Sequence, residues 1–313
     1  MAKIVVIGSL NMDLIAVTPR LPLAGETILG RQFLNEPGGK GANQAFAAAK
    51  LGGDVAMMGR IGTDDHGTRM RANLQAVNCD VRGLQEIEGC SGIAMVLVAE
   101  SGQNSIVVVP GANERYLPVD LHADLKYLAG AELALLQLEI PLATVTAAAQ
   151  AAKRQGTLVI LDPAPAPDKL PHELLSSVDV LTPNETEAAQ LVGGRPPESL
   201  SADEARDIAR RLQGSGAKTV IIKLGARGCL LAESGVAVVE TIPAPSVMVV
   251  DTTAAGDVFN AALAVARSEG ASLVDACRFA VNVAALSVTR LGAQRSMPSR
   301  DEVDGYQPKE SAD

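Results

Sequence analysis

Short apolar runs alternate with alanine-rich or amphipathic stretches along most of the chain. Apolar runs with no polar alternation are typical of strands covered on both faces, and the stretches between them have helical spacing. The pattern therefore predicts an α/β fold in which a mainly parallel sheet is flanked by helices. The predicted strands are residues 4–7, 55–58, 133–138, 157–161 and 219–223, and the predicted helices are residues 43–51, 145–154, 202–212, 258–266 and 273–288.

Two segments do not follow this alternation. Residues 14–33 alternate apolar with polar positions and contain Pro19 and Pro22, whereas residues 92–110 predict a β-hairpin that turns at residues 101–104. Together they predict a small second sheet beside the main one. Two uses of that sheet remain open at this point, a lid over a binding site and an edge extension or dimer contact.

The composition excludes several classes of protein. The chain of 313 residues has 27 basic and 36 acidic side chains, and its net charge of −9 argues against a nucleic-acid or membrane-surface partner. Four scattered cysteines and the absence of an HExxH motif argue against a zinc module or a disulfide framework. The first apolar run, residues 4–7, is too short for a secretory signal, so we expect a cytoplasmic protein without a membrane span.

A glycine-rich cluster at residues 38–43 opens the helix that is predicted to run to Leu51. Glycines let the backbone approach a ligand closely, while Asn43 and the amides of the first helical turn offer hydrogen bonds to hydroxyl groups. The cluster does not have the spacing of a Walker A loop. An ordinary turn is the alternative interpretation.

A second cluster, residues 251–257, precedes the helix that is predicted to begin near Val258. Amides at a helix start bind anions, and Gly256 leaves that approach open. An ionised Asp257 at this place would accept the proton of a hydroxyl group that attacks phosphorus. The alternative is that Asp257 only caps the helix.

Two further clusters follow apolar strands. Asn184 and Glu187 lie one helical turn apart, so they would hold phosphate-bound Mg²⁺ together or, alternatively, form an ordinary helix start with Glu187 as the cap partner. Residues 224–228 contain two glycines three positions apart, which suits a backbone that passes a nucleotide and equally suits a hairpin turn.

Polar side chains also follow two of the predicted strands. Asn11 and Asp13 come after residues 4–7, and Glu139 ends the run 133–138. The carboxyl ends of parallel strands form the ligand crevice of an open α/β sheet, and carboxylates there suit a polyhydroxy substrate. Solvated loop acids are the alternative, and for Glu139 this alternative is favoured on the strand pattern alone.

Taken in order, the motifs match one family along nearly the whole chain. From about Lys3 to Pro298 the sequence carries NMD, GGKGANQA, PGAN, LQLE, DPAPAP, TPNETE, LGARG, DTTAAGD and VTRLGAQRSMP. This order closely resembles the ribokinase family of sugar kinases. The resemblance implies a Rossmann-like α/β domain of residues 1–10, 34–91 and 111–313. It also implies a β-sheet lid of residues 11–33 and 92–110 that forms the contact of a homodimer.

The resemblance further implies a reaction, the ATP-dependent phosphorylation of the ribose 5-hydroxyl to give ribose 5-phosphate and ADP, with Mg²⁺ on the nucleotide and K⁺ as activator. Asp257 would be the general base, and the amides of Ala255 and Gly256 would bind the phosphoryl group in transfer. The implied sugar contacts are Asn11, Met12, Asp13, Gly39, Lys40, Gly41, Ala42, Asn43, Glu139 and Asp257. The implied nucleotide contacts are Asn184, Glu187, Lys223, Leu224, Gly225, Ala226, Arg227, Gly228, Gly256 and Asp257. The implied K⁺ site consists of Asp251, Thr253, Ser287, Arg290, Gly292 and Ser296.

Four positions depart from the family pattern. Ala254 stands where the GAGD motif begins with glycine, Asp162 replaces the asparagine of NPAP, and Lys223 stands where many members have threonine. Val281 occupies the register of a His or Asn near the adenine, and Asn282 comes one position later.

Other functions remain as alternatives. One is a related kinase for deoxyribose, fructose, pseudouridine or another nucleoside, and a more distant one is a sugar sensor without catalysis. A dehydrogenase is set aside because no GxGxxG motif follows the first strand.

Overall fold

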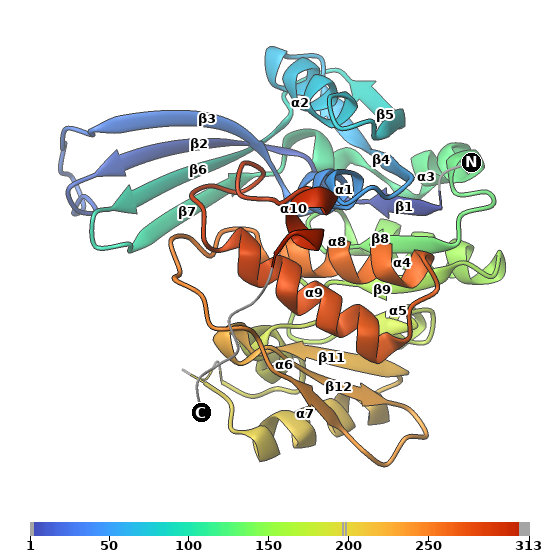
Figure 1. Ribbon diagram of the computed structural model, residues 1–313. Coiled ribbons are helices and arrows are strands. Elements are labelled where there is room, and N and C mark those ends of the chain that lie inside the picture. Colours follow the sequence, from blue (N-terminus) through green and yellow to red (C-terminus); the bar gives the residue numbers. More distant parts are fainter. Residues whose placement is uncertain (1–2, 196, 198, 307–313) are drawn as a thin grey trace.

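The chain folds into a large sheet with helices on both faces and a small sheet that projects from one end of it (Figure 1). The computed structural model describes residues 3–195, 197 and 199–306. This arrangement confirms the predicted α/β fold with a mainly parallel sheet and a small second sheet.

Within the described residues the large sheet has nine strands in the order β13-β12-β11-β10-β9-β8-β1-β4-β5. Neighbouring strands from β11 to β5 pair in parallel, and β12 pairs antiparallel with both β11 and β13. The bounds are β1 Ile4–Ile7, β4 Val55–Gly62, β5 Asp80–Ile87, β8 Leu133–Leu136, β9 Leu158–Leu161, β10 Val180–Leu181, β11 Thr219–Lys223, β12 Cys229–Glu233 and β13 Glu240–Ile242.

Two groups of helices cover the two faces of the large sheet. One face carries α1 (Lys40–Lys50), α2 (Asp65–Gln75), α8 (Ala255–Ser268) and α9 (Leu273–Ser287). The other carries α3 (Pro118–Asp124), α4 (Leu142–Arg154), α5 (His172–Leu175), α6 (Glu185–Leu191) and α7 (Ala202–Gly214). Short helical segments are η1 (Gly111–Arg115), η2 (Leu125–Tyr127), η3 (Gly225–Arg227) and α10 (Arg300–Asp304).

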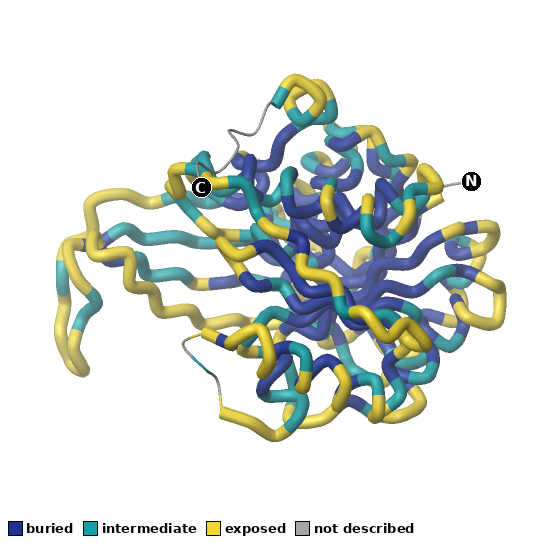
Figure 2. The backbone as a smooth tube through the Cα atoms, turned by 60° about the horizontal axis from the view of Figure 1, so that its bottom comes forward, coloured by how far each residue is buried: buried dark blue, intermediate teal, exposed yellow. Residues whose placement is uncertain are grey.

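Strand β1 explains why its sequence has no polar alternation. Ile4 and Val6 pack in the core on the α1 and α8 side, whereas Val5 and Ile7 pack in the core on the α4 side. Because successive side chains of a strand point to opposite faces, a strand covered on both faces needs apolar residues at every position. Figure 2 shows this interior as the dark blue centre of the molecule.

The small sheet has the order β3-β2-β6-β7. Strand β2 (Asn11–Thr18) pairs antiparallel with β3 (Gln32–Gly38) and parallel with β6 (Gly92–Ala99). The predicted hairpin is formed by β6 and β7 (Asn104–Val109). Strand β3 continues past the predicted boundary at residue 33, because Gly38 still pairs with Asn11. Much of this sheet is exposed, as the yellow and teal strands of Figure 2 show.

Several elements have no counterpart among the predicted strands and helices, including α2, α3, α5, α10, β5, β12 and β13. Helix α2 buries only Gly67, Met70 and Leu74, so its apolar pattern is too sparse to show in the sequence. In the described part of the chain, no helix is both long and apolar enough to cross a bilayer.

Candidate active site

The glycine-rich cluster lies against the start of β2. Gly39 is the N-cap of α1 with a φ of 87°, and a Cβ at this position would lie 2.6 Å from the backbone nitrogen of Asn11. The left-handed conformation and the close approach both require glycine here. As a result, the first turn of α1 is held at the carboxyl end of β1, where ligands bind in open α/β sheets.

Asp257 lies in the first turn of α8 and is only 5% exposed. Its Oδ2 accepts a hydrogen bond from Asn43 Nδ2 at 3.0 Å, and its Oδ1 accepts one from Gln44 Nε2 at 3.1 Å. The helix is capped by Ala254, and no side chain makes a capping bond there. Asp257 is therefore not a cap, and the alternative interpretation of this residue is wrong.

Gln44 connects Asp257 to a second buried carboxylate. Its Nε2 also donates to Asp162 Oδ2 at 3.0 Å, and its Oε1 accepts from Gln137 Nε2 at 2.7 Å. Gln44 is fully buried, as is Gln137. Sequence reasoning assigned no role to either glutamine, although a polar residue in an otherwise alanine-rich helix was the available indication.

The start of α8 offers free backbone donors. The Ala255 amide, which the resemblance implied as a phosphoryl contact, instead donates to Thr252 O at 3.2 Å. Within the described residues the amides of Gly256 and Asp257 have no protein acceptor. Ala254, which precedes them, has a left-handed φ of 60°. The two free amides point where an anion would bind at the positive end of the helix dipole.

Burial and nearby charges together shift the pKa of Asp257. Burial raises the pKa of Asp257 to about 6, the charge of Lys40 opposes that rise, and the charge of Asp162 adds to it. For Lys40, burial lowers the pKa, but Asp257, Asp162, Glu139 and Glu187 together outweigh it and raise the pKa. Lys40 therefore stays charged among these carboxylates.

The sugar-side residues predicted from sequence lie around Glu139. Its Oε2 accepts hydrogen bonds from Ser9 Oγ at 2.6 Å, from the Lys40 amide at 3.0 Å and from Asn11 Nδ2 at 3.5 Å. Asn113 Nδ2 donates to Asn11 Oδ1 at 2.8 Å and so fixes its side-chain orientation. The favoured alternative for Glu139, a solvated loop acid, is wrong because this carboxylate receives three donors.

Asp13 is the least satisfied carboxylate of this group. Burial and then the charges of Glu139, Glu36 and Asp257 raise its pKa to about 7. In the described part of the chain no protein donor is within hydrogen-bond distance of its side chain. Met12 and Ala42, in contrast, have buried side chains in the hydrophobic core.

Asn184 and Glu187 begin α6 with reciprocal bonds. Asn184 Oδ1 accepts from the Glu187 amide, and Glu187 Oε2 accepts from the Asn184 amide, each at 2.8 Å. This confirms the cap interpretation, while Asn184 also bridges to Lys223 at the end of β11. Burial raises the pKa of Glu187 against the opposing charge of Lys223.

The remaining nucleotide-side residues form the turn between β11 and β12, which is the predicted hairpin alternative. Gly228 has a φ of 88°, and Arg227 pairs with Glu185 at the start of α6. This ion pair holds the turn beside α6. Leu224, Gly225 and Ala226 complete the turn.

The candidate K⁺ residues come from the loop before α8 and from the end of α9 with the segment that follows it. Asp251 accepts from the Thr253 amide at 2.9 Å and from the Gly292 amide at 2.8 Å. Burial raises the pKa of Asp251, but these bonds and the Thr253 hydroxyl outweigh it and lower the pKa. The other side chains bind elsewhere: Arg290 pairs with Glu302, Ser287 Oγ donates to Ala284 O, and Ser296 Oγ donates to Ala293 O.

Two further observations concern ligands. In the part of the chain that the structure describes, no three His, Cys, Asp or Glu side chains gather as a metal site. Val281 is buried in the core of α9, so its side chain makes no polar contact with an adenine.

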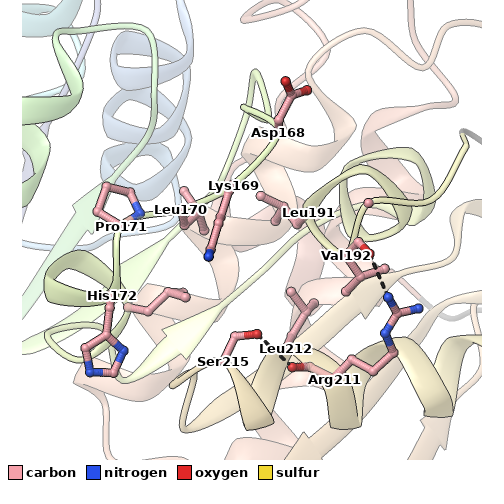
Figure 3. Close-up of a pocket in the computed structure, with 12 residues that line it drawn as sticks. Asp168, Lys169, Leu170, Pro171, His172, Leu191, Val192, Arg211, Leu212 and Ser215 are labelled. Carbon is pink, nitrogen blue, oxygen red and sulfur yellow. Dashed lines mark hydrogen bonds between the residues drawn. The ribbon is translucent and has the colours of Figure 1, made fainter.

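A cavity of about 760 Å³ lies away from all of these residues, between α5, α6 and α7 (Figure 3). The guanidinium of Arg211 is turned to Val192 O at 2.6 Å, and Ser215 donates to Arg211 O. The Arg211 guanidinium and the Ser215 hydroxyl are thus occupied within the protein, and none of the residues predicted for the site lines this cavity.

A buried carboxylate beside a lysine and free helix-start amides, at the carboxyl edge of a parallel sheet, defines an α/β phosphotransferase site. The chain belongs to the pfkB family of carbohydrate kinases, whose model matches residues 1–300. The family predicted from the motif order is thereby confirmed.

Individual relatives cover nearly the whole chain. Ribokinase of Bacillus subtilis is 41% identical over 305 residues, which are 97% of this chain and 99% of the relative. The structure of Arabidopsis thaliana ribokinase complexed with ribose and ATP is 38% identical, with a TM-score of 0.88 and coverage of 96% of this chain and 97% of the other. Deoxyribokinase of Salmonella typhi is 36% identical over 304 residues, 97% of this chain and 98% of the relative.

Proposed function

We propose that this protein transfers the γ-phosphoryl group of ATP to the 5-hydroxyl of D-ribose, giving ribose 5-phosphate and ADP. The observation that carries the proposal is the environment of Asp257, a buried carboxylate held by Asn43 and Gln44 next to two free amides. The ribokinases at about this chain's full length, one of them complexed with ribose and ATP, support ribose and ATP as its substrates.

In the proposed mechanism Asp257 is the general base. Its carboxylate takes the proton of the sugar hydroxyl as that oxygen forms a bond to phosphorus, while the bond to the bridging oxygen of ADP breaks. Lys40 and the amides of Gly256 and Asp257 stabilise the negative charge on the phosphoryl oxygens. Because the amides and Lys40 are already in place, little reorganisation is needed at the moment of transfer.

The sugar would be bound by polar groups at the ends of β1, β2 and β8. Asn11, Asp13 and Glu139, with the amides of residues 39–43, offer acceptors and donors to its hydroxyl groups. The small sheet would close over the sugar as a lid, with β2, β3, β6 and β7 as the moving part.

Mg²⁺ and K⁺ would bind at two different sites. Glu187 would hold water molecules of the Mg²⁺ that ATP brings, since both of its oxygens already accept bonds from Asn184 and retain free lone pairs. The residues from Asp251 to Ser296 named above would bind K⁺, because a hard cation prefers the carboxylate and carbonyl oxygens of these loops. Bound there, K⁺ would offset the charge of Asp251 and fix the loop that leads to Gly256.

Strand β7 supports a homodimer. Its residues Ile106 to Val109 are between 43% and 60% exposed, and β7 is an edge strand of the small sheet. An apolar edge strand of this kind is usually covered by a partner. Val107→Asp should give a smaller species in sedimentation velocity than the unmodified protein. The cytoplasmic location stays a prediction.

The experiment is ADP release from ATP and Mg²⁺ with ribose, deoxyribose, fructose, adenosine and pseudouridine in turn. We expect the highest kcat/KM with ribose, a rise in turnover when K⁺ replaces a large inert cation, and loss of turnover on chelation of Mg²⁺. Asp257→Asn should lower kcat by about 10²–10⁴-fold and leave ribose binding in place.

Two outcomes would favour the alternatives. A higher kcat/KM with deoxyribose would assign the chain to the activity named for the Salmonella relative. Ribose binding without ADP release would indicate a sensor. Normal turnover of Asp257→Asn would remove the general-base assignment.

A further inference from the structure

Two of the departures from the family pattern meet in the site. Lys223 ends β11 and Asp162 follows β9, and their side chains form an ion pair with Nζ 3.0 Å from Oδ1. The Asp162 side chain is 3% exposed and that of Lys223 is 12% exposed. The lysine is thus the more exposed member of the pair.

A contribution to the stability of the fold does not by itself explain this buried ion pair. Removing two charges from water costs several kcal/mol per ion, and apolar residues of similar volume often serve the fold equally well. The pair also lies at the carboxyl edge of the sheet, where the neighbouring groups belong to the candidate active site.

Lys223 faces the start of α8. A Cβ built on Gly256 would lie 3.3 Å from Lys223 Nζ, so the ammonium group lies directly beside this glycine. In the described part of the chain Asp162 is the one protein acceptor that Lys223 Nζ has, which leaves two of its three N–H donors free.

A cation next to a helix start is electrostatically unfavourable without an anion, because the helix dipole is positive there. The free donors of Lys223 therefore lie beside the start of α8, where the amides of Gly256 and Asp257 have no acceptor. An anion bound there would accept hydrogen bonds from the free amides and from Lys223. It would also offset the repulsion between the lysine and the positive end of the helix dipole.

We propose that Lys223 is a catalytic residue that binds the phosphoryl group during transfer, and that Asp162 is the positioning residue that holds it beside Gly256 before ATP arrives. This inference rests on the proposed function. As the sugar oxygen bonds to phosphorus and its proton passes to Asp257, the electron pair of the breaking bond leaves with ADP. Lys223 donates to an oxygen of the phosphoryl group throughout.

Gln44 fixes the orientation of the Asp162 carboxylate. It donates to Asp162 Oδ2, so Oδ1 is left for Lys223, and its second hydrogen goes to Asp257. The positioning residue and the general base are therefore held by one amide group.

The test is a double-variant cycle with kcat and nucleotide binding as readouts. Lys223→Met alone leaves Asp162 as a buried unpaired charge and risks misfolding, so the decisive variant is Asp162→Asn/Lys223→Met, in which both partners are neutral. Lys218→Met is the matched control, since Lys218 lies just before β11 and pairs with Asp179 at 2.6 Å, away from the site. Urea unfolding checks that each variant is folded.

We expect the double variant to have a kcat about 10²-fold below that of Asp162→Asn, as for loss of one donor to a transition-state oxyanion. Its Kd for ATP should rise, whereas its Kd for ADP should stay unchanged, because Lys223 contacts the group that ADP lacks. Lys218→Met should match the unmodified protein in both.

A folded double variant with the kcat and the ATP affinity of the unmodified protein would overturn the role of Lys223. An equal loss of ATP and ADP affinity would also overturn it, since the contact would then not be to the transferred group. Absence of ribose-dependent ADP release in the unmodified protein is a different result and would count against the proposed function itself.

Discussion

Two buried ion pairs beside the large sheet have similar chemistry and different surroundings. Arg60 of β4 lies 2.8 Å from Asp124 of α3, with side chains 5% and 6% exposed, and its guanidinium stacks on Tyr116 at 4.0 Å. Lys223 and Asp162 are similarly buried, but Lys223 adjoins the unpaired amides of α8. Burial of an ion pair is thus not an indication of function by itself. The unpaired backbone amides at the start of α8, which lie beside Lys223 and not beside Arg60, are what separate the two.

The largest effect on stability is expected at the enclosed pair. Asp124→Asn leaves the Arg60 charge buried without its partner, which should lower the free energy of unfolding by about 3–5 kcal/mol. Activity per folded molecule should not change, because the contacts of this pair are to each other, to Gly59 O and to Tyr116 and not to Asp257. Urea unfolding and an active-site titration measure the two quantities separately.

The matched control replaces both partners at once. Arg60→Met/Asp124→Leu removes both charges, and its stability should be closer to that of the unmodified protein than the stability of Asp124→Asn. If the single variant loses less than about 1 kcal/mol, the pair is not the structural anchor that its burial indicates.

Asp13 differs from Asp124 and Asp162 because, in the described part of the chain, it forms no ion pair. The folded-state pKa of Asp13, about 7, lies above its ordinary value of 3.8. The associated stability is therefore complete at pH values below the ordinary pKa and is lost as the pH rises through 7. Asp13→Asn should then stabilise the ligand-free protein at pH 8 by on the order of 2–4 kcal/mol and weaken ribose binding.

Urea midpoints at pH 5 and pH 8, with ribose titrations, measure both effects of Asp13→Asn. The gain in stability should be clearly smaller at pH 5 than at pH 8, and it should disappear only below the ordinary pKa of 3.8. A variant that is less stable at pH 8 would show that Asp13 is better satisfied in the protein than its surroundings indicate.

The charge of Asp162 should also affect the pH dependence of catalysis by Asp257. With its pKa raised to about 6, Asp257 loses its capacity to accept a proton as the pH falls through that value, so kcat/KM should fall there. Because the charge of Asp162 raises this pKa, Asp162→Asn should move the acid limb to lower pH, by up to about one unit. A profile of kcat/KM from pH 4.5 to 8 measures the shift, and a shift to higher pH would contradict it.

The sequence predicted the strands best where both faces are buried. Runs such as residues 4–7 and 219–223 have no polar interruption, so the pattern shows them directly. Helix α2 escaped prediction because three of its residues are enough to anchor it. Local spacing cannot distinguish a helix that makes so few core contacts from a polar loop.

The site was predictable as a set of motifs but not as a network. Asp257, Asn43 and Lys40 followed from glycine-rich clusters at helix starts, and the structure brings them together. The link from Asp162 to Gln44 spans 118 positions, and that from Lys223 to Asp162 spans 61. Which side-chain ends meet across such distances depends on the strand order, which one sequence does not contain.

The smallest effect is expected at the exposed counterpart of the Lys223 pair. Lys218 and Asp179 are 51% and 29% exposed, and water already solvates the ammonium group. Lys218→Met should therefore change the free energy of unfolding by at most about 1 kcal/mol, with the difference decreasing further at high salt. A loss as large as that of Asp124→Asn, measured by urea unfolding at low and high salt, would mean that burial does not rank these pairs. The comparison between Arg60 and Lys223 would then need a different physical basis.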